Sequence, residues 1–108
     1  MIEPLPPIPK TLCEMLKEYP GHLARVHDAL APVAKEPQVA PRFELAIWVL
    51  EDMAGAFFEE ARERLALAKR GGDSGLASEL EAEEALMAKL VIQKPWFGDK
   101  EFSRFFGK

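Results

Sequence analysis

The segment from residue 42 to residue 70 constrains the fold more than any other feature of the chain. It contains no proline, and its only glycine is Gly55. Apolar residues recur three and four positions apart along it, which places them on one face of a helix: Phe43, Ile47, Leu50, Ala54, Phe57, Ala61, Leu65 and Ala68. Alternating β-branched runs are scarce elsewhere, so the pattern predicts an all-α protein built on one long helix.

The first third of this helix is apolar on nearly every side. Leu45, Ala46, Trp48 and Val49 add to the stripe there. A helix that is apolar all round is usually covered on several sides. We therefore expect this end to lie inside the protein, with a pocket near Trp48 as one candidate ligand site.

A helical hairpin follows from the turn signals after the long helix. Gly71 and Gly72 end it, and Asp73 or Ser74 can cap a second helix over 74–93, which Pro95 follows. Short turns of this kind join antiparallel helices. The predicted buried edge of the second helix comprises Leu76, Leu80, Met87, Leu90 and Val91.

Two short helices are expected before the hairpin. Residues 1–10 hold four of the nine prolines and predict an extended arm. Thr11 and Glu14 form a capping-box pattern, so a first helix should run from Thr11 to a point before Pro20. A second should begin near Gly21, and Pro32 should kink or end it. The segment 34–41 is expected to be a linker.

The C-terminal segment 96–108 contains five of the ten aromatic side chains. Asp99 can cap a short helix there and Gly107 can end it. Such a short helix is stable only when its apolar face is packed against something.

The predicted organisation is thus an extended arm (1–10), a single helical domain (11–95) and an aromatic segment (96–108) packed on the hairpin of helices 42–70 and 74–93.

Charge and cysteine content restrict the classes of function. The formal net charge of −4 and the pI near 5.2 argue against a general nucleic-acid binder. Cys13 is the only cysteine, so no internal disulfide forms and a reducing, cytoplasmic location is expected. The apolar runs are too short to cross a bilayer, so no membrane association is predicted.

No motif supports a catalytic, cofactor or metal site. The nucleophile and base candidates are Cys13, His22, His27 and Tyr19. A lone thiol is usually a small core residue. The two histidines are five positions apart, unlike the pair on one helical face that binds zinc. We therefore predict no catalytic residue, cofactor or metal ligand.

The functional expectation is a small non-enzymatic protein that acts by protein–protein contact, as an adaptor, regulator or inhibitor. Exposed apolar strips on a helix usually indicate a partner, and a homodimer of two hairpins is favoured. The predicted interaction surface comprises Phe58 and Leu67 on the long helix and Trp96, Phe97, Phe102, Phe105 and Phe106 in the tail.

Two alternatives remain. One is a small enzyme or ligand carrier that uses Cys13, His22 and His27 or the pocket near Trp48. The other is a nucleic-acid accessory protein that uses the tail, where Lys94, Lys100 and Arg104 interleave with aromatic residues. The acidic overall charge disfavours it.

Overall fold

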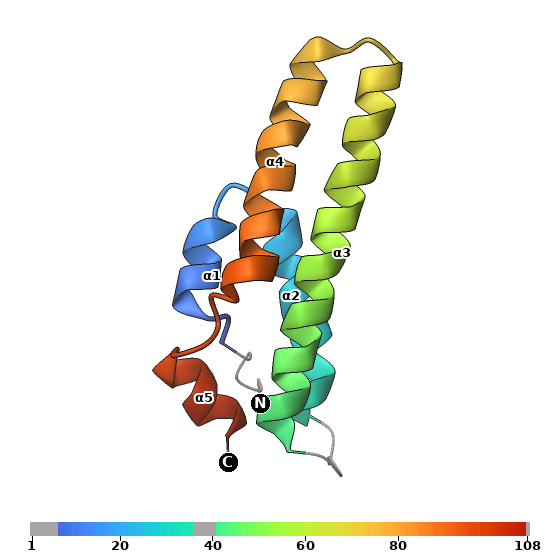
Figure 1. The fold of residues 1–108 in the computed structure, drawn as a ribbon. Coiled ribbons are helices and arrows are strands. Elements are labelled where there is room, and N and C mark those ends of the chain that lie inside the picture. Colours follow the sequence, from blue (N-terminus) through green and yellow to red (C-terminus); the bar gives the residue numbers. More distant parts are fainter. Residues whose placement is uncertain (1–6, 36–40, 108) are drawn as a thin grey trace. The chain divides into compact units, whose positions relative to one another are not determined.

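The computed structural model describes residues 7–35 and 41–107 of the chain (Figure 1). These residues form no strand, so the predicted all-α class is confirmed. The predicted proline arm and linker lie largely outside them, in residues 1–6 and 36–40. The helices are α1 (Lys10–Met15), α2 (Pro20–Lys35), α3 (Arg42–Arg70), α4 (Ser74–Gln93) and α5 (Lys100–Phe106). None of the described helices combines the length and apolar character needed to cross a membrane.

The chain divides into two compact units. One, here called the terminal unit, contains residues 1–50 and 95–108, and the other, the hairpin unit, contains residues 51–94. Helix α3 therefore contributes its start to the terminal unit and its remainder to the hairpin unit.

The hairpin unit has the antiparallel helices that the sequence predicts, side by side in Figure 1. Gly72 takes a φ of 73° in the turn, a value that favours glycine. Asp73 caps α4, because its Oδ1 accepts a hydrogen bond from Leu76 N at 3.0 Å. The predicted α3 stripe is buried at Ala54, Phe57, Ala61, Leu65 and Ala68.

The buried edge of α4 differs from the prediction at several positions. Leu76 and Val91 are exposed, whereas Ala77 and Glu83 are buried beside Leu80, Met87 and Leu90. Leu76 lies in the first turn of α4 and lines an open groove with Leu67 of α3. Glu83 lies three positions after Leu80 and four before Met87, so its spacing matches the buried edge of α4. Its ion pair with Arg64 compensates for the hydration that its carboxylate loses on burial.

Helix α1 begins within one residue of its predicted start near Thr11, but the cap predicted for it is wrong. The helix begins at Lys10 with Pro9 at the N-cap position, and no side chain of its own caps it. Thr11 therefore lies inside the helix, and the predicted capping box does not form. The Lys10 N–H instead donates to Asp99 Oδ2 at 2.7 Å, so a distant carboxylate takes the place of the local cap.

Helix α2 continues through Pro32 and ends at Lys35. Proline cannot donate the helical hydrogen bond to residue i−4, which is Asp28. Pro32 and Asp28 are both exposed, so water can satisfy the freed Asp28 carbonyl. The proline therefore does not end the helix.

The expectation of an enclosed start to α3 fails at Trp48. This residue is 59% exposed, whereas Ala46, Ile47 and Leu50 are buried. Trp48 lies four positions from Glu44 on one side and from Asp52 on the other, and both are exposed. Residues four apart share a helical face, so Trp48 belongs to the polar side of α3.

The aromatic tail is part of the core of the terminal unit. Trp96, Phe102 and Phe106 are each no more than 1% exposed. The Phe102 ring lies 4.9 Å from that of Phe106 and 6.1 Å from that of Phe43 in the first turn of α3. The aromatic segment therefore packs on the start of the long helix, as predicted.

Candidate interaction surfaces

The Asp99 carboxylate organises the polar part of the terminal unit. Its Oδ1 accepts from Phe102 N at 2.9 Å and caps α5, as the sequence predicts. Its Oδ2 accepts from Lys10 N at the start of α1. One side chain therefore accepts a backbone hydrogen bond from each of two helices, α1 and α5, and links the tail to the first helix.

Cys13 lies beside this junction in an environment that favours the protonated thiol. Its Sγ donates to the carbonyl oxygen of Ile8 at 3.9 Å. Burial raises the pKa of the Cys13 thiol, and the negative charges of Asp99 and Glu14 raise it further. A nucleophilic cysteine needs the opposite shift.

The two histidines lie on α2. The His22 ring stacks on the ring of Tyr19, with centroids 5.6 Å apart. His27 is half-buried five positions further on. Among the residues that the structure describes, no group of three or more histidine, cysteine or acidic side chains could hold a metal ion.

An open hollow of about 690 Å³ lies between the start of α1 and the tail, and Cys13, Lys10, Phe97 and Lys100 are among its lining residues. Trp48, near which a pocket was predicted, does not line it. The hollow carries both acidic and basic side chains, since Asp99 and Glu101 also line it.

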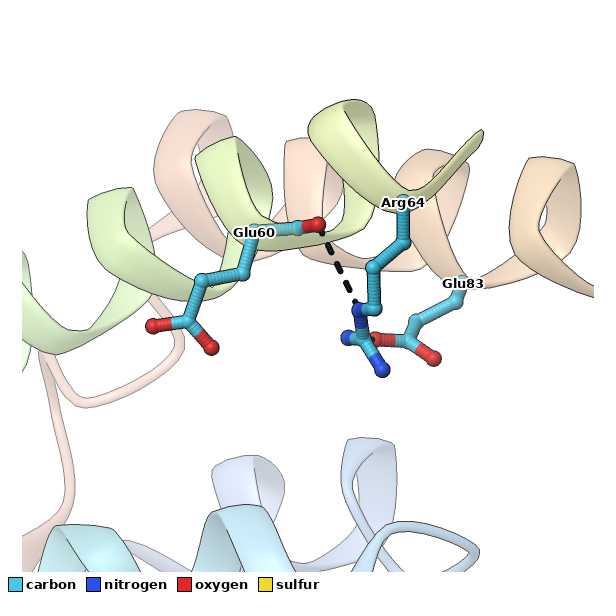
Figure 2. A network of polar contacts seen from close by, with 3 residues as sticks. All are labelled: Glu60, Arg64 and Glu83. Carbon is cyan, nitrogen blue, oxygen red and sulfur yellow. Dashed lines mark hydrogen bonds and ion pairs between the residues drawn. The ribbon is translucent and has the colours of Figure 1, made fainter. Parts of the chain in front are cut away.

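Ion pairs hold α3 and α4 together in the hairpin unit. Arg64 Nη2 lies 2.6 Å from Glu83 Oε2, and its Nε donates to the Glu60 backbone oxygen at 3.4 Å (Figure 2). Glu83 is only 7% exposed, which makes it a charged residue of the hairpin core.

Two further ion pairs join the same helices. Lys69 Nζ lies 3.8 Å from Glu81 Oε1, and Lys94 Nζ lies 3.0 Å from Glu51 Oε2. Lys69 and Glu81 are well exposed, so their interaction is weak. Together these pairs and Arg64–Glu83 define the register of the antiparallel hairpin.

The predicted interaction residues divide into buried and exposed groups. Trp96, Phe102 and Phe106 are buried and offer no exposed surface, which corrects the expectation for these three. Phe97 is 58% exposed and Phe105 is half-buried. On α3, Leu67 is 60% exposed and Phe58 is half-buried. Phe58 and Leu67 are about two and a half helical turns apart, so they lie on opposite flanks of α3.

Two exposed apolar residues, Ile92 and Trp48, lie outside the predicted interaction surface. Ile92 near the end of α4 is 79% exposed, and Trp48 is the largest exposed apolar side chain among the described residues of the terminal unit. Their exposure can be inferred from helical spacing, because each residue is offset from the buried stripe of its helix.

Comparison with protein-family models, curated proteins and solved structures found no match.

Proposed function

We propose that this chain is a small non-enzymatic interaction protein, an adaptor, regulator or inhibitor that works by protein–protein contact. The observation that carries the proposal is the exposure of large apolar side chains on well-formed helices and in the tail: Trp48, Leu67, Ile92 and Phe97 are each between 58% and 79% exposed. Large apolar and aromatic side chains are enriched in the cores of protein–protein interfaces.

The chemistry of the terminal unit favours this proposal over a small enzyme or ligand carrier that uses Cys13, His22 and His27. The raised pKa of Cys13 opposes the thiolate that nucleophilic catalysis needs. The lone free thiol also suits a reducing compartment, and we include the cytoplasm in the proposal on that ground.

The packing of the tail also favours protein contact over the nucleic-acid alternative. Stacking on single-stranded nucleic acid needs accessible aromatic faces. Trp96, Phe102 and Phe106 are buried, and of the tail aromatics only Phe97 is well exposed. The tail therefore has little aromatic surface for bases.

Affinity capture from the native host tests the proposed function. The wild-type chain is compared with Trp48→Ala, Leu67→Ala and Phe97→Ala, and with Arg70→Ala as an exposed polar control. We expect at least one apolar variant to lose a protein that both the wild type and the control retain. If no protein depends on any of the exposed apolar residues, the proposal is wrong. Equal circular dichroism spectra would show that the variants fold.

A further inference from the structure

We propose that the occupant of one side of the hairpin is a second copy of this chain. This inference rests on the proposed function and names the partner for one surface. The surface, called the Gly55 face, comprises Gly55, Phe58 and Arg62 on α3 and Glu84, Ala88 and Ile92 on α4.

Helical spacing and one ion pair place these residues on the same side of the hairpin. Gly55, Phe58 and Arg62 are three and four positions apart, and the line continues to Lys69. Glu84, Ala88 and Ile92 are four apart, and their line begins at Glu81. Lys69 pairs with Glu81, so the two lines face the same side. Arg64 and Glu83 pair on the opposite side, next to a groove lined by Leu67 and Leu76.

The Gly55 face has opposite charges on its two helices. On α3 the face carries Arg62 and its line continues to Lys69, whereas on α4 the face carries Glu84 and its line begins at Glu81. Lys69 and Glu81 form the weak pair within the hairpin, while Arg62 and Glu84 form no ion pair with any residue that the structure describes. Their charges are therefore available to a partner with the reverse arrangement.

A second copy presents the reverse arrangement of charges when it is related to the first by a twofold axis that runs parallel to the axes of α3 and α4. Such an interface is self-complementary, because each residue pair occurs twice. The axis places α3 of one copy on α4 of the other, and the basic line then meets the acidic line. If α3 lay on α3 instead, Arg62 of one copy would lie away from Glu84 of the other, so these two charges favour the first arrangement.

The register of the hairpin makes the shapes match as well. The pairs Glu51–Lys94 and Arg64–Glu83 set Gly55 about level with Ile92, Phe58 with Ala88 and Arg62 with Glu84. In the twofold arrangement Phe58 of one copy meets Ala88 of the other. Ile92, which is 79% exposed, meets Gly55. Each large side chain therefore faces a small residue.

Gly55 gives an independent reason to expect close approach from outside. Glycine inside a helix lowers helix stability relative to alanine. A Cβ built at Gly55 would meet nothing within 4 Å, so packing inside the chain does not require the glycine. The Ile92 side chain of a second copy, packed against the α3 backbone, would require it.

Analytical ultracentrifugation of the full chain tests the proposal through charge reversal. We expect a dimer for the wild type, and at least about tenfold weaker association for Arg62→Glu and for Glu84→Arg, because each places like charges together. An equimolar mixture of the two variants should form a heterodimer. In it, the glutamate introduced in one variant meets the arginine introduced in the other, and the remaining pair is native. A pairing within one chain could not give this rescue.

Two further variants separate the effect on the face from an effect on folding. Gly55→Leu favours the helix but fills the space for Ile92, so it should weaken the dimer while circular dichroism stays unchanged. Arg70→Glu changes an exposed arginine of α3 outside the face and should leave association as in the wild type.

A monomeric wild type, or a dimer that Gly55→Leu and both charge reversals leave intact, would overturn the proposal. Failure of the mixture to associate would also overturn it. These results are distinguishable from failure of the proposed function, because capture of a different protein through Trp48 or Phe97 does not depend on self-association.

Discussion

At the residue scale, Asp99 connects two helix starts that are far apart in the sequence. Its two carboxylate oxygens accept from Lys10 N and Phe102 N at 2.7 Å and 2.9 Å. A side-chain cap contributes about 1 kcal/mol to stability. The loss of Asp99 therefore affects α1 and α5 at once.

We predict that Asp99→Ala lowers the free energy of unfolding by about 2 kcal/mol, because two caps of about 1 kcal/mol are lost. Urea denaturation followed by circular dichroism measures the change. Asp73→Ala is the matched control, since Asp73 caps only α4 and its loss should cost about 1 kcal/mol. Equal losses for the two variants would contradict the double role of Asp99.

The Cys13 thiol should react slowly in the folded protein near neutral pH. Its pKa is raised by burial and by Asp99 and Glu14, so less thiolate is present than in the unfolded chain. We expect alkylation by iodoacetamide to be slower in the native state than in urea, and to accelerate as the pH rises above the ordinary thiol pKa of about 8.5.

The raised pKa of Cys13 also determines how its contribution to folding stability changes with pH. Because the pKa is higher in the folded state, the contribution of the protonated thiol is fully present below the unfolded-state pKa and is lost as the pH rises through the folded-state pKa. Cys13→Ser removes the titrating group and serves as the control. Equal alkylation rates in the native and unfolded states would contradict the prediction.

At the element scale, the two sides of the hairpin carry ion pairs of different strength. Arg64–Glu83 joins a nearly buried carboxylate to a half-exposed arginine, whereas both members of Lys69–Glu81 are well exposed. We expect Arg64→Leu to lower the free energy of unfolding by about 1 to 2 kcal/mol, since a buried carboxylate loses a charged donor. Urea denaturation measures it.

Lys69→Leu is the matched control for that variant. It removes an exposed, long ion pair from the same helix and should change stability by less than about 0.5 kcal/mol. If Lys69→Leu is as destabilising as Arg64→Leu, burial of Glu83 does not determine the strength of the pair.

The tail offers a second comparison between a buried and an exposed side chain. Phe102 is fully buried and contacts the rings of Phe43 and Phe106, whereas Phe97 is 58% exposed. Phe102→Ala should lower the free energy of unfolding by about 3 to 5 kcal/mol, through lost burial and the cavity it leaves. Phe97→Ala should change it by less than about 0.5 kcal/mol. Similar effects for the two variants would show that α5 is not packed.

At the scale of the whole molecule, the tail supplies three of the large buried side chains of the terminal unit: Trp96, Phe102 and Phe106. Deletion of residues 96–108 should therefore deprotect amides in α1, α2 and the start of α3 more than amides in the hairpin unit. Hydrogen exchange read by mass spectrometry measures this pattern, and the melting temperature should fall. Uniform deprotection, or none, would contradict it.

The order and ends of the long helices could be predicted from the sequence because their determinants are local. Proline, glycine and capping residues determine where α3 and α4 begin and end. The spacing of their apolar residues, three and four positions apart, predicts that both segments are helical. The Asp99 cap of α5 was predicted for the same reason. Each of these features depends on residues within one or two turns of helix.

The exposure of the candidate interaction residues was predictable only in part. Leu67 and Phe97 are exposed as an interaction surface requires, whereas Trp96, Phe102 and Phe106 are buried. Composition shows that the tail is aromatic, but it does not show which rings face the core. The spacing of Glu83 with Leu80 and Met87 could have indicated its burial, and the exposure of Trp48 follows from its spacing with Glu44 and Asp52.

The sequence by itself determined the helical class, the hairpin and the local caps, because these depend on backbone preferences and on neighbours along the chain. Only the tertiary structure decided that Asp99 caps α1, 89 positions away, and that Arg64 compensates the burial of Glu83. Both are contacts between segments distant in sequence. Such contacts form only after the helices pack, and no local pattern specifies which polar groups then meet.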